Sequence, residues 1–146
     1  MTASTTPPTL DDEQRATLAA LADELVPAAL GMPAASEVDV QGEWVDRVLR
    51  ARPDLGPNLL RTLDGARGQD PADVVHRLNE EDADGMATLG TVVTGAYYLH
   101  PRVRELLGYR GQPHAPASPG ESDHYLRDGI LDPVRARGPV YRPTPS

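Results

Sequence analysis

The sequence predicts an all-α fold, a small bundle of about five or six helices with a long, mostly irregular C-terminal strap. Within residues 10–107, Leu, Val and Ala recur at helical spacing, and Pro and Gly separate the segments. Residues 108–146 are rich in Pro, Gly, Arg and Tyr and hold too few aliphatic side chains to bury a core. We therefore expect a flexible N-terminal segment at residues 1–9, a helical bundle at residues 10–107 and a C-terminal extension at residues 108–146.

The first two helices follow from the spacing of Leu, Val and Trp. Residues 9–12 (Thr-Leu-Asp-Asp) resemble a capping box with Thr9 as the N-cap, and they open a helix that Pro27 ends. A second, shorter helix is predicted between a loop at residues 31–33 and Pro53. Its apolar stripe consists of Trp44, Val45, Val48 and Leu49.

Two further helices precede the most apolar segment. A Leu-rich stripe at residues 59–63 predicts a third helix that ends near Gly65 or Gly68. Asp70 as the N-cap and Pro71 at the first helical position predict a fourth. An acidic run then falls where a fifth helix would begin, and we interpret it as an exposed helix cap in preference to a metal site. The run consists of Glu80, Glu81, Asp82 and Asp84.

Residues 86–99 are the most apolar part of the chain, and we expect them to form the central helix of the bundle. The Thr-Val-Val-Thr sequence at residues 91–94 alone would be typical of a strand, but the length of the periodic segment favours a helix. Gly85, Gly90 and Gly95 each cost about 1 kcal/mol relative to Ala in a helix. A neighbouring helix that passes close by would explain this cost.

The chain leaves the bundle through a short helix. Pro101 is expected at its start, with His100 as the cap, and Gly108 at its end. A further short helix is expected around residues 125–131, in an otherwise irregular strap.

The net charge of −8 is unevenly distributed along the chain. Residues 1–100 hold 17 acidic groups and 7 Arg, whereas residues 101–146 hold 5 acidic groups and 7 Arg. An acidic body argues against nucleic acid or an anionic membrane as the main ligand. The polar residues 1–8 carry no export signal, and no apolar stretch approaches the length of a membrane span. We expect a cytoplasmic protein without direct membrane insertion.

No catalytic, cofactor-binding or metal-ligating residue is predicted in this chain. Cys is absent, the four His residues are far apart, and no Ser falls in a nucleophile motif. Acid pairs occur only at expected helix ends or exposed faces, and no glycine-rich dinucleotide motif is present. A small stand-alone enzyme or ligand-binding protein that uses carboxylates and His remains the alternative to a binding role.

The tyrosines and arginines of the C-terminal part are the predicted partner-binding residues. Tyr and Arg are enriched at protein interfaces. Tyr97 and Tyr98 point to different sides of a helix, so one small core does not easily bury both, and the other three Tyr lie in the strap, where little core exists. A strap that folds back over its own bundle, with Tyr98, Tyr109 and Tyr141 covering the core, is the competing interpretation. The predicted partner-binding residues are Tyr97, Tyr98, Tyr109, Arg110, Arg137, Tyr141 and Arg142.

Several segments resemble one known family, the gluconate 2-dehydrogenase subunit 3 family. They are residues 10–27 (LDDEQRATLAALADELVP), 31–35 (GMPAA), 44–49 (WVDRVL), 95–98 (GAYY) and 107–111 (LGYRG).

This resemblance implies an accessory role. Such small helical subunits accompany a large flavin-dependent sugar or alcohol dehydrogenase or oxidase, help it fold, stay soluble or be exported, and leave FAD and the chemistry to that partner. The family supplies no catalytic residue to transfer onto this chain. Many members carry a twin-arginine signal, which this sequence lacks. The chain is therefore expected to act in the cytoplasm, or to leave it attached to a partner that holds the signal.

Overall fold

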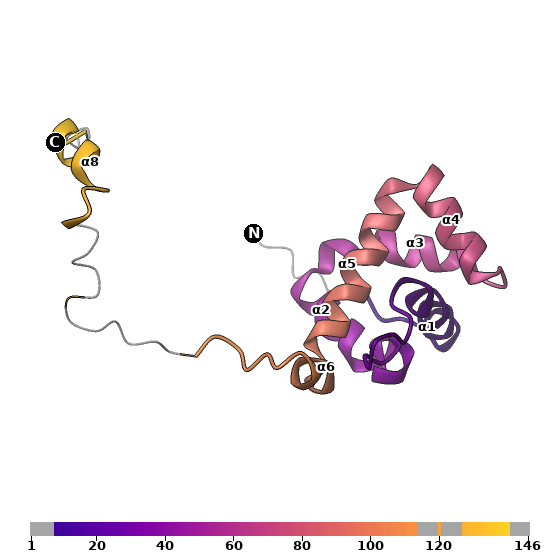
Figure 1. Cartoon of the computed structure of the whole chain (residues 1–146). Coiled ribbons are helices and arrows are strands. Elements are labelled where there is room, and N and C mark those ends of the chain that lie inside the picture. Colours follow the sequence, from indigo (N-terminus) through magenta and orange to yellow (C-terminus); the bar gives the residue numbers. More distant parts are fainter. Residues whose placement is uncertain (1–7, 114–119, 121–126, 141–146) are drawn as a thin grey trace. The chain divides into compact units, whose positions relative to one another are not determined.

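The computed structural model describes residues 8–113, residue 120 and residues 127–140. The chain divides into two compact units, Met1–Arg110 and Gly111–Ser146. Within the described residues every regular element is helical, apart from an isolated bridge between Ala29 and Met32. The predicted all-α fold is confirmed, and helices α1 to α6 form the bundle (Figure 1).

Helix α1 (Asp12–Leu25) begins with a capping box, but not with the predicted one. Asp11 is the N-cap: its carboxylate accepts a hydrogen bond from the backbone N–H of Gln14 at 2.7 Å. In return, the side-chain oxygen of Gln14 accepts one from the backbone N–H of Asp11 at 3.0 Å. The assignment of Thr9 as the N-cap is wrong, because the amide of Gln14 serves as the reciprocal acceptor two residues later than expected.

A tight segment that the sequence did not predict lies between α1 and α2. A 3-10 turn (η1, Ser36–Val38) is followed by a π-helical turn (η2, Val40–Trp44), which continues into α2 (Val45–Ala51). Between the two turns, Asp39 adopts a left-handed conformation with φ of 53°, and Gly42 departs from helical geometry. The predicted second helix is therefore confirmed, with an irregular entry.

Arg15 on α1 holds the π-helical turn in place. Its guanidinium donates to the carbonyl oxygens of Gln41 and Gly42 at 2.7 and 3.1 Å and pairs with Asp46 at 3.0 Å. Because a π-turn takes main-chain groups out of the regular helical pattern, such side-chain partners stabilise it.

The next helices agree with the sequence patterns. A 3-10 turn (η3, Pro53–Leu55) leads into α3 (Gly56–Ala66), which ends close to Gly65. Helix α4 (Pro71–Glu81) begins as predicted, since the carboxylate of Asp70 accepts hydrogen bonds from two backbone N–H groups of the first turn, at 3.0 and 3.3 Å.

Helix α5 (Ala83–Leu99) is the central helix, as expected, and contacts α1, α2, α3, α4 and α6 (Figure 1). The β-branched residues 91–94 are helical, because their two valines are fully buried among the neighbouring helices. The carboxylate of Asp82 caps the helix by accepting a hydrogen bond from the N–H of Gly85 at 2.9 Å. The predicted helix start is therefore confirmed for Asp82 and Asp84, whereas Glu80 and Glu81 form the end of α4.

The three glycines of α5 have different surroundings. A methyl group at Gly95 would lie 3.3 Å from Cγ2 of Val48 on α2, so a neighbouring helix does pass close by there. A methyl group added at Gly90 would have no atom of a neighbouring element within 4 Å. A methyl group added at Gly85 would first meet the capping carboxylate of Asp82. The expectation of a close helix is therefore correct for one glycine of the three.

The core is built mainly from Leu and Val, with Trp44 and Tyr97 as its aromatic members. The largest fully buried side chains are Leu18, Leu21, Leu49, Leu59, Leu63, Leu89, Val38, Val40, Val45, Val74, Val92 and Val93.

The last helix of the bundle is α6 (Pro101–Leu106). Its predicted cap is confirmed, because Nδ1 of His100 accepts a hydrogen bond from the N–H of Arg102 at 3.1 Å. Gly108, with φ of 66°, follows the helix, as expected for a residue at a helix C-terminus.

In the second unit, the helix α8 covers Asp132–Arg137 and buries no residue. The prediction of a helix around residues 125–131 is correct at residue 127, which is helical, and wrong over residues 128–131, which form bends and turns. Residues 125 and 126 lie outside the described residues. Pro133 explains the difference, since proline is favoured in the first turn of a helix, and Gly138 follows its end.

Candidate protein-binding surface

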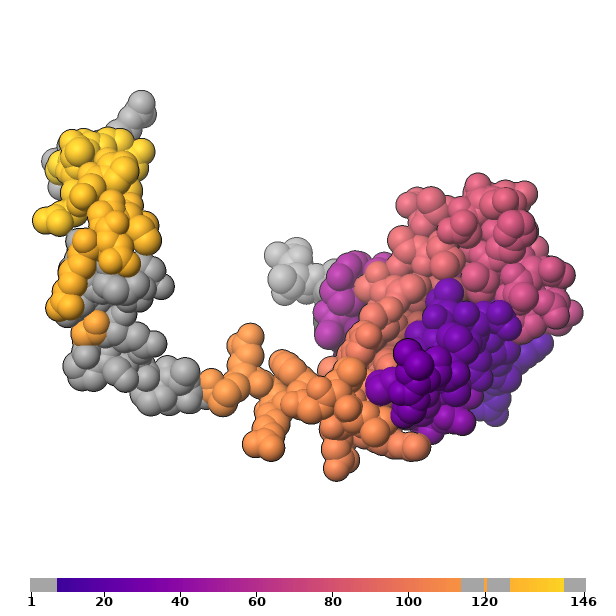
Figure 2. Space-filling model, in the orientation of Figure 1, coloured from indigo at the N-terminus to yellow at the C-terminus, as the bar shows by residue number. Residues whose placement is uncertain are grey.

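Exposed apolar side chains gather along one short stretch of the first unit, from the end of α5 through α6 to the turn that follows. In Figure 2 this stretch, coloured orange, lies at the surface of the bundle. We call these side chains, together with those of Arg102, Arg104 and Arg110, the α6 surface. Its apolar members and their exposed fractions are Tyr98 53%, Leu99 42%, Leu106 50%, Leu107 52% and Tyr109 54%.

The start of α6 is held to the bundle by a buried side chain and by the ring of the capping residue. Val103 is fully buried and anchors α6 to the core. The ring of His100, which caps the helix, lies edge-on to the indole of Trp44, with ring centroids 5.2 Å apart. The guanidinium of Arg47 lies 4.6 Å from the centroid of the same indole. The helix that presents the α6 surface is therefore fixed to the bundle and is not a loosely attached turn.

The end of α6 is closed by main-chain hydrogen bonds. The N–H of Gly108 donates to the carbonyl oxygen of Glu105 at 2.9 Å, and the N–H of Tyr109 donates to that of Arg104 at 2.8 Å. The guanidinium of Arg104 also lies 5.4 Å from the centroid of the Tyr109 ring, in a cation–π contact. These contacts order the exposed tyrosine in advance, which lowers the entropic cost of burying it in an interface.

Tyr97 and Tyr98 have opposite roles, although they are neighbours in the sequence. Tyr97 is only 4% exposed, and its hydroxyl donates to the carbonyl oxygen of Pro33 at 2.8 Å. Burial raises the pKa of its phenol, and the nearby Tyr98 and Glu37 add to the rise. The edge of one ring meets the face of the other, with centroids 5.5 Å apart. Tyr97 is therefore a core residue, and Tyr98 belongs to the surface.

The other predicted binding residues fall in three places. Tyr109 and Arg110 are exposed on the α6 surface. Arg137 is exposed at the end of α8, in the second unit. Tyr141 and Arg142 lie outside the described residues.

The sequence did not single out Leu99, Leu106 or Leu107 as surface residues. Within α6 only Val103 is buried, and Leu107 follows the helix as its C-cap. Adjacent apolar residues are both buried elsewhere in the bundle, as Val48 and Leu49 are on α2, so the spacing of these leucines did not mark them as exposed.

Two polar hollows lie between α3, α4 and α5, with volumes of about 360 and 560 Å³. Arg61 and Asp82 line both and form an ion pair at 2.8 Å. The amide of Asn58 donates to Thr88 Oγ1 at 2.7 Å and to the carbonyl oxygen of Asp84 at 3.0 Å. The polar groups named here are thus engaged in joining helices.

The pKa of Asp82 is lowered, first by the N–H of Gly85 and then by the Arg61 guanidinium. A carboxyl group held in its ionised form is unsuited to act as a general acid near neutral pH. Among residues 8–113, 120 and 127–140, no group of three or more His, Asp or Glu is placed to hold a metal ion. The carboxylates that are close together here act as caps and ion-pair partners.

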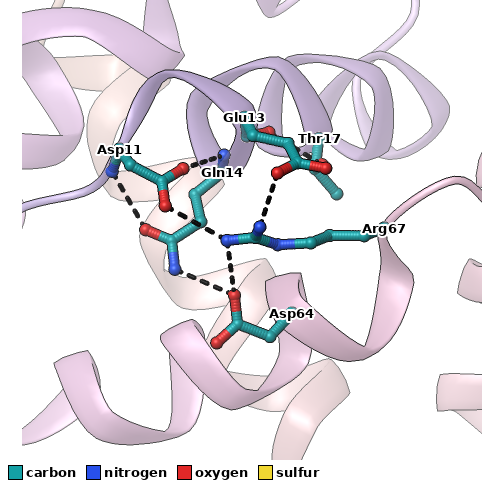
Figure 3. A network of polar contacts seen from close by, with 6 residues as sticks. All are labelled: Asp11, Glu13, Gln14, Thr17, Asp64 and Arg67. Carbon is teal, nitrogen blue, oxygen red and sulfur yellow. Dashed lines mark hydrogen bonds and ion pairs between the residues drawn. The ribbon is translucent and has the colours of Figure 1, made fainter.

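A second polar cluster connects the start of α1 to the end of α3 (Figure 3). The guanidinium of Arg67 lies between Asp11, Glu13 and Asp64, at 3.1, 2.5 and 3.0 Å, and Gln14 donates to Asp64 at 2.9 Å. This arrangement fastens two helix ends that are distant in the sequence. Its single cation is already paired with three carboxylates, so we assign it a structural role.

No family model, curated protein or solved structure matches the chain. In the part of the chain that the structure describes, none of the helices is long and apolar enough to cross a membrane.

Proposed function

We propose that this chain is a non-catalytic accessory subunit that binds and stabilises a large flavin-dependent sugar or alcohol oxidoreductase, which carries FAD. The observation that carries the proposal is the α6 surface, where five large apolar side chains are exposed from the end of α5 to the turn after α6. This segment is anchored by the buried Val103 and capped by His100. Large exposed apolar patches mark interaction sites in soluble proteins. The class of partner comes from the resemblance of five segments to an accessory-subunit family.

The size of the surface indicates how it would be used. Burying a Leu-sized side chain contributes about 1.5–3 kcal/mol, so five such groups are enough for the centre of an interface. A stable interface, however, buries about 800 Å² on each partner and uses about 20–30 residues a side. The α6 surface is therefore an anchor, and further contacts must come from elsewhere in the chain.

The second unit offers such contacts. Around α8, the side chains of Ile130, Val134 and Val140 are exposed, and Arg137 stands at the end of the helix. We propose that residues 127–140 bind the same partner as a second element. A tethered second contact raises the overall affinity without requiring a large rigid surface. Because binding precedes any export in this scheme, the chain would meet its partner in the cytoplasm and stay there or leave attached to it.

Purification of the tagged chain from its native host tests the proposal. We expect a larger protein to co-purify and the complex to show the absorption spectrum of a bound flavin. A stable isolated monomer with a protease-resistant C-terminal part and no co-purifying flavoprotein would contradict it. Turnover or saturable small-molecule binding by the isolated chain would instead establish the alternative, a stand-alone enzyme or ligand-binding protein.

A further inference from the structure

The arginines of the α6 surface lack the carboxylate partners that most other arginines of the bundle have in the part of the chain that the structure describes. Elsewhere, five arginines of the bundle pair with carboxylates of the same chain: Arg15, Arg47, Arg52, Arg61 and Arg67. By contrast, Arg102, Arg104 and Arg110 pair with no carboxylate among the described residues. Arg102 and Arg110 are exposed. These positive charges are available to an external group.

The charge of this end is opposite to that of the rest of the bundle. Residues 98–110 carry three Arg and one Glu, whereas residues 1–97 carry 17 acidic groups and 7 Arg. An acidic partner would be repelled by most faces of the bundle and attracted at this one. Complementary charge of this kind fixes the orientation of two proteins and raises the rate at which they associate.

Arg102 also borders a hollow beside the loop at residues 28–33. The hollow has a volume of about 380 Å³, and its lining is mainly the Ala, Met and Pro side chains of that loop. Glu37 is the acidic residue of the lining, and its carboxylate already accepts a hydrogen bond from the N–H of Ala34 at 3.0 Å. Leu30, at the tip of the loop, is fully exposed. Apolar surface and a positive charge therefore adjoin at this place too.

We propose that the α6 surface docks on a protein face that is apolar at its centre and carries Asp or Glu around it. The exposed Leu and Tyr side chains fill the apolar centre, and Arg102 and Arg110 pair with the acidic rim. Arg104 remains stacked on Tyr109 and presents the donors at the edge of its guanidinium to a carboxylate. This inference rests on the proposed function, because it names the chemistry of the partner that the proposed accessory subunit binds.

The test uses the full chain, tagged and expressed in its native host, with two charge reversals. R102E/R110E reverses the charge of two arginines on the α6 surface. R50E/R77E, the matched control, reverses the charge of two exposed arginines elsewhere on the bundle. The captured protein is purified, and its Kd for each purified chain is measured at low and high salt. Circular dichroism and thermal unfolding verify that all variants are folded, and R102K/R110K, which keeps the charge, serves as the conservative variant.

We expect R102E/R110E to raise Kd by about ten- to a hundredfold, and R50E/R77E to change it by less than about threefold. Added salt should weaken binding by the wild type and by R102K/R110K. It should strengthen binding by R102E/R110E, because salt screens the repulsion between the new carboxylates and the acidic rim. A captured protein without flavin that shows this pattern would support the docking chemistry and refute the proposed flavoprotein partner. A captured flavoprotein that binds both reversals equally, without salt dependence, would support the function and overturn the docking chemistry.

Separate experiments test whether the α6 surface binds a membrane or a second copy of the chain instead of a partner protein. Flotation of the wild type with anionic phospholipid vesicles, lost in R102E/R110E, would replace the protein partner by a membrane. Self-association in sedimentation experiments, lost in the same variant, would replace it by a second copy of the chain. Either result overturns the proposal, as does the recovery of no partner at all.

Discussion

The hydroxyl of Tyr97 donates a hydrogen bond of 2.8 Å to the carbonyl oxygen of Pro33, and the phenol ring is almost fully buried. This bond joins the end of the central helix to the loop that follows α1, 64 positions earlier in the sequence. The next residue, Tyr98, points its ring to the surface. The last turn of α5 therefore closes the core on one side and begins the α6 surface on the other.

Replacing Tyr97 by Phe should lower the free energy of unfolding by about 1–2 kcal/mol, because the buried carbonyl of Pro33 loses its donor. The matched variant Tyr98→Phe, at an exposed position, should change it by less than about 0.5 kcal/mol. Urea unfolding of the two variants measures both values. Equal effects would show that the buried hydrogen bond contributes nothing specific.

Gly90→Ala and Gly95→Ala form a second matched pair on the same helix. Ala is favoured over Gly in a helix by about 1 kcal/mol, and at Gly90 nothing opposes the added methyl group. At Gly95 the methyl would crowd Val48 at 3.3 Å, which offsets the gain. Thermal unfolding should give a clearly higher Tm for Gly90→Ala than for Gly95→Ala, and the reverse order would contradict the packing of α2 against α5.

Stability should depend on pH through Asp82. Its pKa is lowered in the folded state by the Gly85 N–H and by Arg61, below the ordinary value of 3.8. The resulting stabilisation is present above that value and is lost as the pH falls through the lower folded-state pKa. Asp82→Asn keeps a capping side chain but does not titrate.

The difference in unfolding free energy between wild type and Asp82→Asn should therefore stay constant down to about pH 5 and shrink as the pH falls further. Chemical denaturation across this range provides the measurement. A difference that stayed constant below about pH 5 as well, or grew on acidification, would show that the carboxylate is not stabilised in its ionised form.

The cap of α6 determines how well the α6 surface is ordered. His100→Ala removes the acceptor for the Arg102 N–H and should cost about 1 kcal/mol locally, whereas His100→Asn should restore most of the loss. Amide hydrogen exchange should report about fivefold faster exchange at residues 103–109 in His100→Ala. Unchanged exchange in the alanine variant would show that Val103 alone holds the helix.

The sequence predicted the helices whose boundaries depend on local chemistry. The cap at Asp70, the cap at His100 and the long periodicity of α5 each have a short-range cause, and each was found. The π-helical turn at Val40–Trp44 was missed because it is held by Arg15, a residue far earlier in the chain.

The α6 surface could be predicted only in part. Tyr98, Tyr109 and Arg110 were singled out by residue type, but Tyr97 was placed with them although it is buried. Which of two adjacent tyrosines faces the core depends on the position of Pro33, a tertiary contact. The role of the leucines after Val103 depends likewise on how α6 packs against α5, which spacing alone does not determine.

The flavin content of the protein isolated with this chain from its native host tests the central claim most directly. The measurement compares the wild type with the variant L106S/L107S, which makes the centre of the α6 surface polar and leaves the buried Val103 in place. We predict a flavin absorption spectrum with the wild type and its loss with the variant, while circular dichroism of the two chains stays the same. Equal flavin recovery with both chains, or none with the wild type, would contradict the account.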